Sequence, residues 1–328
     1  MTVIRAKVLG FCMGVRRAVA LAFEEARKAA KNGVPVYTFG PLIHNPKTLD
    51  DLKKLGIQSI DDFAPADLPS NSIIIIRAHG ISPALERDLR EKGCRIVDAT
   101  CPKVKANQLK TLELIGEGYY LFLAGESNHA EIEGLLGYAR ETTLQKARET
   151  ALQKARETTL QEARETSLRE AKTGSNSSYL KCVVVGNADD ARMAAEELYR
   201  KNKFLKTALL GQTTISKDEY DNIKDEIIKF FPNLEIINTI CAATSERQQA
   251  LREMLPLADA VIVAGGEESA NTRRLLAIAK ESGKPCVLAE NARDIPGEFF
   301  SFSTVGLCAG ASTPDSVVEE IELVLKRD

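Results

Sequence analysis

Three cysteines of this chain stand in the same local sequence context and are its clearest candidates for chemistry. Cys12, Cys101 and Cys241 each lie between a short apolar run and a stretch of helical character. The last two contexts read almost as repeats, V-D-A-T-C at 97–101 and I-N-T-I-C at 237–241. We expect each cysteine at a strand-to-helix turn, where α/β sheets bind ligands and a helix N-terminus favours a thiolate. The pattern predicts three lobes that each donate one thiolate to a shared centre.

Three thiolates suit two kinds of metal centre. One is zinc, completed by a fourth ligand or by water. The other is an iron–sulfur cluster with an incomplete set of protein ligands, which leaves one iron free for a substrate. Ordinary buried cysteines are the alternative that needs no metal. The total of seven cysteines is odd and does not indicate a disulfide framework.

The three histidines of the chain all fall in loops just past predicted strands. His44 follows the strand expected at 34–39, His79 ends the run I-I-I-I-R-A-H, and His129 follows the strand expected at 119–124. The carboxyl ends of parallel strands meet at one edge of a sheet, so these side chains should face the same rim as the cysteines. Taken singly, each histidine also suits a hydrogen-bonded surface position.

Small polar residues gather at the same expected rim, in segments 211–214, 265–271 and 310–313. Ser269, with Asn271 beside it, and Ser312 are placed where helices should begin. Hydroxyls and free backbone N–H groups at helix starts form an anion site without lysine or arginine. Plain N-capping explains each of these segments on its own. Together with the histidines they predict a site for a phosphate or a diphosphate.

Glu131 has two interpretations. As the third helical position after Asn128, its carboxylate could complete a capping box. As a carboxyl beside His129 at the rim of a largely buried site, it could donate a proton. The spacing alone does not decide between them.

The elements that position these residues belong to a chain of 328 residues with a formal net charge of −2. This length predicts two or three domains. The sequence contains no stretch long and apolar enough to span a bilayer and no secretory signal, so we expect a cytoplasmic protein without membrane contact. The near-neutral charge, without a basic stripe, argues against a nucleic-acid partner.

Apolar runs alternate with helical stretches along the chain, which predicts an α/β fold of parallel sheets with crossover helices. The expected strands are 3–8, 34–39, 73–77, 95–97, 119–124, 181–185, 207–211, 234–237, 259–264, 285–288 and 303–307. We place the lobes at residues 1–98, 99–238 and 239–310, with a C-terminal helix in 311–328. The expected helix starts are Asn45-Pro46, Ser82-Pro83, Thr313-Pro314, and a capping box formed by Ser216 and Glu219.

One segment departs from this alternation. Residues 139–170 are four copies of an eight-residue unit, beginning with A-R-E-T-T-L-Q-K, within an insertion that we place at 139–172. The composition favours helix, but an eight-residue period turns the apolar stripe by about 80° per repeat. We therefore expect a solvated, frayed helical arm, with a docking element for a partner as the alternative.

The motifs together resemble the hydroxymethylbutenyl diphosphate reductase family of the LytB/IspH type. They occur in the order typical of that family and span nearly the whole chain. The matching motifs are G-F-C-M-G-V (10–15), H-N (44–45), R-A-H-G (77–80), D-A-T-C-P (98–102), H-A-E-I-E-G (129–134), Q-T-T-I-S (212–216), T-I-C-A-A-T (239–244), S-A-N (269–271) and A-G-A-S-T-P (309–314).

The resemblance implies a trefoil of three α/β lobes around one [4Fe–4S] cluster, held by Cys12, Cys101 and Cys241 with the fourth iron open. It implies that Glu131 delivers a proton, with Thr213 close to it. The implied reaction reduces (E)-4-hydroxy-3-methylbut-2-enyl diphosphate to isopentenyl or dimethylallyl diphosphate, the last step of the non-mevalonate isoprenoid pathway. The implied diphosphate contacts are His44, His79, His129, Ser269, Asn271 and Ser312. Ferredoxin or flavodoxin is the implied electron donor, and a monomer or weak homodimer the implied assembly.

Three positions depart from the usual pattern of that family. Ala130 replaces a proline, Ala270 a second serine, and Cys308 a threonine, which puts the fine geometry of the phosphate pocket in question. Cys94, Cys182 and Cys286 lie outside the motifs and are expected to be structural. Two other functions use the same residues, a zinc-dependent hydrolase of a phosphorylated small molecule and a non-catalytic iron–sulfur sensor.

Overall fold

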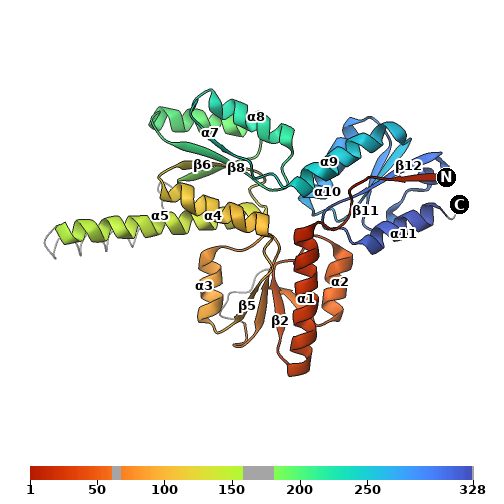
Figure 1. The fold of residues 1–328 in the computed structure, drawn as a ribbon, viewed down its shortest axis with the longest axis horizontal. Helices are drawn as coiled ribbons and strands as arrows, with labels where there is room; N and C mark the ends of the chain where they lie inside the picture. Colours follow the sequence, from red (N-terminus) through yellow and green to blue (C-terminus); the bar gives the residue numbers. More distant parts are fainter. Residues whose placement is uncertain (61–67, 158–180, 327–328) are drawn as a thin grey trace.

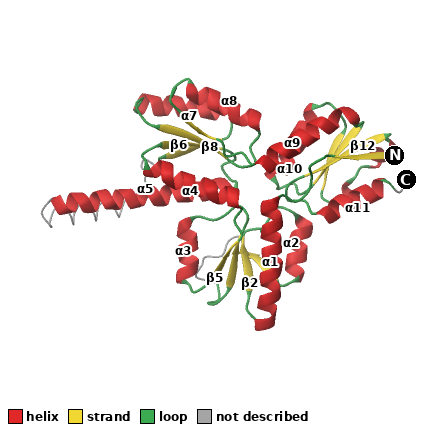
Figure 2. Ribbon diagram, viewed as in Figure 1, coloured by secondary structure: helices red, strands yellow, loops and turns green. Residues whose placement is uncertain are grey.

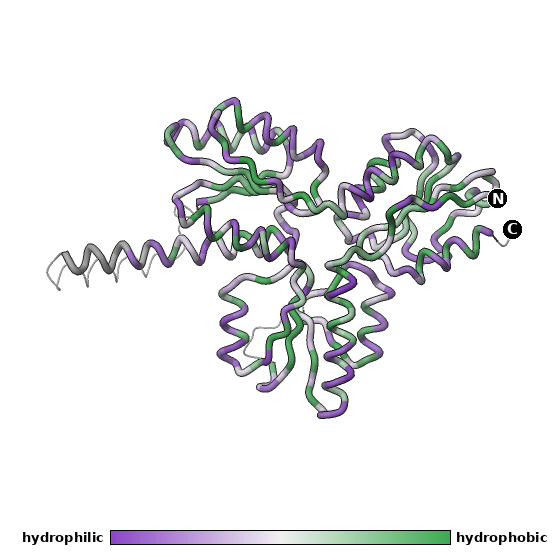
Figure 3. Tube along the Cα trace, in the orientation of Figure 1, coloured by the Kyte–Doolittle hydropathy of each residue, from purple (hydrophilic) through white to green (hydrophobic). Residues whose placement is uncertain are grey.

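The computed structural model describes residues 1–60, 68–157 and 181–326. These residues form three parallel four-stranded sheets, each flanked by helices, and the three lobes meet at the middle of the molecule (Figure 1, Figure 2). The predicted α/β trefoil is therefore confirmed. Hydrophobic residues follow the strands inside each lobe, while hydrophilic residues are concentrated on the outer helices (Figure 3). In the described residues, no helix combines the length and the apolar character needed to cross a bilayer.

The first sheet has the strand order β3-β2-β4-β5. Its central strand β4 is four isoleucines, all buried, as expected for a parallel strand covered by helices on both faces. The strand β3 was not predicted, because its sequence I-Q-S-I exposes both middle residues. The elements of this lobe are α1 (Met13–Asn32), β2 (Val36–Phe39), α2 (Pro46–Lys54), β3 (Ile57–Ile60), β4 (Ile73–Ile76), α3 (Pro83–Glu91) and β5 (Arg95–Asp98).

The second sheet has the strand order β7-β6-β8-β9, and its strand β8 is buried along its whole length. Its elements are α4 (Pro102–Gly116), β6 (Tyr120–Ala124), α5 (Ala130–Glu157), β7 (Cys182–Val185), α7 (Ala188–Lys201), β8 (Thr207–Gly211), α8 (Lys217–Ile228) and β9 (Glu235–Ile237).

The third sheet has the strand order β1-β12-β10-β11 and contains the first strand of the chain. Its helices are α9 (Ala242–Met254), α10 (Ala270–Glu281) and α11 (Asp315–Leu325). Its strands are β1 (Thr2–Arg5), β10 (Ala260–Ala264), β11 (Cys286–Ala289) and β12 (Thr304–Ala309), with 3₁₀ turns η3 (Leu255–Leu257), η4 (Ala292–Asp294) and η5 (Gly297–Ser301).

The strand pairing places one element differently from the boundaries expected for the lobes. Residues 2–5 were grouped with the first lobe, yet β1 pairs in parallel with β12 of the third sheet. The C-terminal helix α11 packs on this same sheet, because Val317, Val318 and Ile321 belong to its core. As domains, the segments 1–98, 99–238, 239–310 and 311–328 stay a proposal.

The repeat segment begins inside α5, which projects away from the body of the molecule (Figure 1). Up to Ala139 its inward residues are buried, whereas Leu144 is 55% exposed. Lys146 donates to the Gly116 carbonyl, and Glu141 pairs with Arg87 at 3.0 Å. The segment is helical as far as Glu157, whereas its solvated, frayed character stays a prediction, and the repeats beyond Glu157 lie outside the described residues.

The predicted helix starts are confirmed at three of four places. Asn45 and Ser82 cap α2 and α3, and Ser216 with Glu219 forms the capping box of α8. The expected start at Thr313 is wrong, because its hydroxyl donates to the Ala264 carbonyl, at 2.9 Å, and α11 starts after Pro314.

Candidate functional site

The helices α1, α4 and α9 begin at the middle of the molecule, where the three lobes meet (Figure 1). Each of them has one of the three cysteines as its N-cap residue, Cys12 for α1, Cys101 for α4 and Cys241 for α9. The sequence therefore placed all three at strand-to-helix turns, and the fold brings the three turns together.

The backbone N–H of each cysteine also donates to a carbonyl of a neighbouring lobe. The N–H of Cys12 donates to the Ala311 carbonyl at 3.0 Å. The N–H of Cys101 donates to Ala78 of the first lobe, and that of Cys241 to Thr213 of the second, both at 2.9 Å. The geometry of the centre therefore depends on all three lobes.

A glycine allows the first helix to approach the second cysteine closely. A Cβ atom added at Gly14 would lie 2.5 Å from the Sγ atom of Cys101, far inside any normal contact distance. Burial is the largest cause that raises the pKa of the Cys101 thiol, and the nearby Cys12 and Cys241 raise it further. The backbone N–H groups of α4 lower this pKa, as predicted for a helix N-terminus, but burial outweighs them.

The cysteine centre differs from a site for a single ion. Within residues 1–60, 68–157 and 181–326, no three histidine, cysteine, aspartate or glutamate side chains lie close enough to bind one metal ion. In an iron–sulfur cluster each cysteine binds a different iron, so its thiolates need not converge on one atom. The three helix starts and the space kept by Gly14 fit a group of this kind.

The three histidines form one cluster next to the cysteine centre. Their ring centroids are 5.0 Å apart for His44 and His79, 5.1 Å for His79 and His129, and 6.4 Å for His44 and His129. Burial is the main cause that lowers the pKa of all three rings, to about 3 for His129. The rings are therefore neutral at pH 7 in this environment.

His129 has a defined neutral form. The backbone N–H of Glu131 donates to its Nδ1 atom at 3.2 Å, so the ring carries its proton on Nε2. The Nε2–H group remains as a hydrogen-bond donor. A neutral histidine can thus bind an anion by donation, and it gains a proton if the anion brings enough negative charge.

Hydroxyl and amide groups of the third lobe complete this polar site. Ser269 caps α10, as predicted, whereas Ser312 precedes α11 by three residues and caps no helix. The Ser312 hydroxyl instead donates to the His44 carbonyl at 3.2 Å, and it lies 3.3 Å from the Ser269 hydroxyl. Gly266 permits this approach, since a Cβ there would lie 2.7 Å from the His44 carbonyl oxygen.

Several buried polar atoms at the site have no hydrogen-bond partner among the described residues. Both amide atoms of Asn271 and the Nδ1 atom of His79 are of this kind. Because burying a polar atom without a partner is costly, such atoms point to a bound polar molecule. Their surroundings of hydroxyl, imidazole and amide groups suit a phosphate-containing ligand.

Glu131 lies at the site and caps no helix. Its carboxylate accepts from the Thr213 N–H at 3.0 Å and from the Thr213 hydroxyl at 2.7 Å. It is almost fully buried, and this burial raises its pKa to about 7 although the bonds from Thr213 lower it. The proton-donor interpretation is the one that this geometry supports.

The sequence did not reveal the cationic groups around the histidines. Arg77, Arg273 and Arg274 are close enough to lower histidine pKa values, although the anion site was expected without arginine. Arg273 and Arg274 both pair with Glu126, at 2.6 and 3.0 Å, and so tie α10 to the loop after β6. Arg273 and Arg274 lie on α10, where arginine usually faces solvent, so nothing in the pattern marked them. Arg77 follows β4 within the motif R-A-H-G, but no role was predicted for it.

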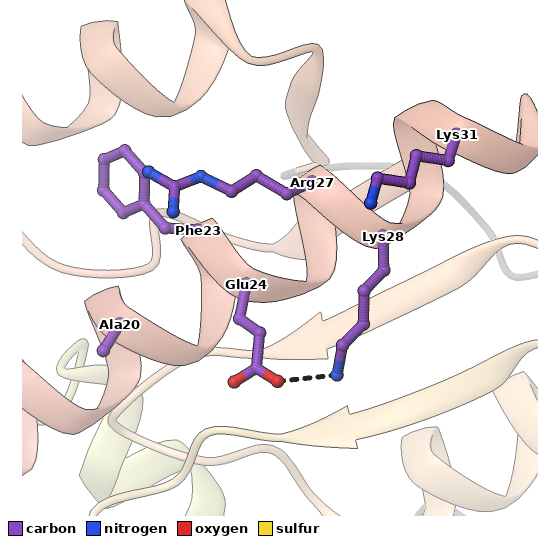
Figure 4. A pocket seen from close by; sticks show the side chains of 6 residues that line it. All are labelled: Ala20, Phe23, Glu24, Arg27, Lys28 and Lys31. Carbon is purple, nitrogen blue, oxygen red and sulfur yellow. Dashed lines mark ion pairs between the residues drawn. The ribbon is translucent and has the colours of Figure 1, made fainter.

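The remaining cysteines lie away from the centre. Cys94, Cys182 and Cys308 are buried, and burial raises the pKa of Cys182 and of Cys308 to about 12, which keeps both as thiols. Of the departures from the family pattern, Ala130 and Ala270 are also buried. A hollow of about 440 Å³ on the outer side of α1 is unrelated to this chemistry; it is lined by Ala20, Phe23, Glu24, Arg27, Lys28 and Lys31 (Figure 4).

Comparison with known proteins extends over nearly the whole chain. The sequence model of a family described as LytB protein matches residues 3–326. A 4-hydroxy-3-methylbut-2-enyl diphosphate reductase of Treponema denticola is 38% identical over 326 residues, 98% of each chain.

Two solved structures resemble the fold. The E-1-hydroxy-2-methyl-but-2-enyl-4-diphosphate reductase from Plasmodium falciparum has a TM-score of 0.79 at 25% identity, over 98% of this chain and 87% of that one. An (E)-4-hydroxy-3-methyl-but-2-enyl diphosphate reductase, described as the terminal enzyme of the non-mevalonate pathway, has a TM-score of 0.65 at 34% identity, over 100% of both. Because the family model covers nearly the whole chain and relatives are 38% identical over 98% of it, this chain belongs to the LytB protein family.

Proposed function

We propose that the chain is an iron–sulfur reductase that converts (E)-4-hydroxy-3-methylbut-2-enyl diphosphate into isopentenyl diphosphate and dimethylallyl diphosphate. The reaction adds two electrons and two protons, breaks the bond between C4 and its hydroxyl oxygen, and releases water. The relatives with this name, at up to 38% identity over the full length, support the assignment. The observation that carries it is the meeting of three cysteine turns with a histidine cluster and a protonatable buried carboxyl.

The cofactor in this proposal is one [4Fe–4S] cluster with Cys12, Cys101 and Cys241 as ligands and the fourth iron open. When bound, it supplies the electrons and a Lewis-acidic iron for the hydroxyl group. The three helix N-termini favour negative charge at the centre, which suits an anionic cluster. Ferredoxin or flavodoxin is the proposed electron donor, and a monomer or weak homodimer the proposed assembly.

The polar site binds the diphosphate in this proposal. His44, His79 and His129 donate hydrogen bonds or carry a proton taken up with the anion, and they are helped by Ser269, Asn271 and Ser312. The unpartnered atoms of Asn271 and His79 gain partners when the anion is present. Arg273 and Arg274, which already pair with Glu126, connect the lobes and contribute positive electrostatic potential, without direct contact to the ligand.

Glu131 holds the proton that lets the hydroxyl group leave as water. With a pKa of about 7 it is protonated in a large fraction of molecules at neutral pH, so it can act as a general acid. The two bonds from Thr213 fix the direction of its carboxyl group. The lobes exclude bulk water, because Glu131, Thr213 and His129 are all buried.

The proposal is tested under anaerobic conditions with protein reconstituted with iron and sulfide. The oxidation of reduced methyl viologen is followed after addition of the hydroxymethylbutenyl diphosphate. We expect substrate-dependent oxidation that is lost in Cys12→Ser and kept in the matched variant Cys286→Ser, whose cysteine lies outside the centre.

The other outcomes separate the two alternative functions. A colourless protein that carries zinc would mean that the reductase assignment is wrong and would favour a hydrolase. A protein loaded with cluster that binds the diphosphate without turnover would point to a sensor.

A further inference from the structure

Arg247 is a buried arginine with an unusual set of partners. It lies on α9, six residues after Cys241, and is only 4% exposed. Its Nη1 atom donates to the Ala243 carbonyl at 2.7 Å, and its Nη2 atom donates to the Gly10 carbonyl at 2.6 Å. The Nε atom has no partner among the described residues, and none of their carboxylates forms an ion pair with this side chain.

The positive charge of Arg247 needs a counter-charge, because burying an unpaired ion is strongly unfavourable. A guanidinium does not lose its proton in proteins, so deprotonation is not available to relieve the cost. Burial lowers the pKa of Arg247, and the groups that raise it are Cys12, Cys241 and, least, the neighbouring Glu246. Both of its carbonyl partners lie two residues from one of these cysteines, Gly10 before Cys12 and Ala243 after Cys241.

Arg17 makes a similar connection on the other side of the centre, but at the surface. It donates from α1 to the carbonyls of Thr100 and Asp98, at 3.2 and 3.3 Å, just before Cys101. Its side chain is exposed, so water and salt screen its charge. The two arginines thus join the cysteine segments in a comparable way, and only Arg247 places a charge in a low-dielectric environment.

We propose that Arg247 is a positioning residue whose buried charge raises the reduction potential of the cluster held by Cys12, Cys101 and Cys241. This inference rests on the proposed function, since it needs an iron–sulfur cluster at the centre. Each electron added makes the cluster more negative, and a fixed cation nearby stabilises the reduced form more than the oxidised form. The effect is large where the surroundings are buried and small where solvent screens the charge.

The test measures the potential of the cluster without substrate, in protein reconstituted anaerobically. The midpoint potential is followed by visible absorbance and electron paramagnetic resonance in the wild type, Arg247→Gln, Arg247→Lys and Arg17→Gln. We expect Arg247→Gln to shift the potential to lower values, Arg247→Lys to retain most of the wild-type value, and Arg17→Gln to leave it unchanged. The two glutamine variants each keep an amide donor for one backbone carbonyl, so they differ mainly in the burial of the lost charge.

The result that would overturn the proposal is a wild-type potential in an Arg247→Gln protein with full iron and sulfide content. If Arg247→Gln takes up no cluster, cluster uptake by Arg247→Lys distinguishes a role of the charge from a structural role of the side chain. Uptake by Arg247→Lys alone would show that the charge is required, whereas equal loss in both variants would reduce Arg247 to a structural role. Failure of the proposed function looks different, because the wild type itself would then contain no iron and sulfide or show no turnover.

Discussion

Replacing Glu131 with glutamine should remove the proposed proton donor while leaving its surroundings in place. The carboxylate accepts from the Thr213 N–H and from the Thr213 hydroxyl. In Glu131→Gln the amide oxygen can still accept from the N–H group. The amide nitrogen can donate to the hydroxyl, whose oxygen is also an acceptor. We therefore expect the variant to fold, to bind the cluster and to bind the diphosphate nearly as well as the wild type.

The size of the effect follows from the raised pKa of this carboxyl. With a pKa of about 7, roughly half of the molecules carry the proton at pH 7, against about 0.3% for a carboxyl at the ordinary value of 4.5. General acid catalysis contributes roughly 10²–10⁴-fold to a rate, or about 3–5 kcal/mol of activation free energy. We expect kcat of Glu131→Gln to fall by a factor in this range, with little change in substrate affinity.

The assay is single-turnover reduction of the diphosphate by pre-reduced protein, together with a binding titration of the same substrate. Glu113→Gln is a matched control, because Glu113 is an exposed carboxylate on α4 away from the site. Between pH 6 and 9 the wild-type rate should decline as Glu131 loses its proton, while the residual rate of the variant should not follow that ionisation. A variant with a near wild-type rate would refute the role of Glu131 as proton donor.

Three further outcomes are expected. Gly14→Ala should strongly reduce iron and sulfide content, since its Cβ would lie 2.5 Å from Cys101 Sγ, whereas Gly116→Ala, with nothing within 4 Å, should keep both. A full content of iron and sulfide in Gly14→Ala would mean that the starts of α1 and α4 can move apart at little cost in free energy. The protein should take up protons near pH 7 when it binds the diphosphate. Burial lowers the pKa values of the histidines, and the charge of a bound anion raises them again. Calorimetry in buffers of different ionisation enthalpy measures this uptake, and equal heats would contradict it. Because folding raises the pKa of the Glu131 carboxyl, the wild type should lose about 3 kcal/mol of stability relative to Glu131→Gln as pH rises from about 4.5 to 7. Thermal unfolding of both proteins at several pH values measures this difference.

The sequence located the candidate cysteines and histidines because each of them follows a predicted strand. Cys101 and Cys241 stand in near-identical contexts, and a strand followed by a helix places the residue between them at one edge of a sheet. The histidines follow the same rule. Their convergence into one cluster depends on how three lobes face each other, which local periodicity does not contain.

Other features depended on contacts between distant segments. In the sequence Glu131 fitted a capping box and a proton donor equally well, and the contact that favours the proton donor is with Thr213, 82 residues away. Arg247 was missed because arginine in a helix is usually exposed, and its burial arises from the loop at Gly10. The pairing of β1 with β12 also joins distant segments. Residues 2–5 were grouped with the first lobe because their neighbours in sequence belong to it.

The bond between Cys12 and Ala311 has a consequence for how the protein is made. Its acceptor lies near the end of the chain, as does β12, the partner of β1. At roughly 5–20 residues per second, the ribosome needs about 15–60 s to reach that acceptor after Cys12 has been synthesised. During this interval the backbone N–H of Cys12 lacks its acceptor, although the Cys12 side chain can already cap α1. A nascent chain that has not reached residue 311 therefore lacks this contact, and the three cysteine turns come together only after the third lobe has been made.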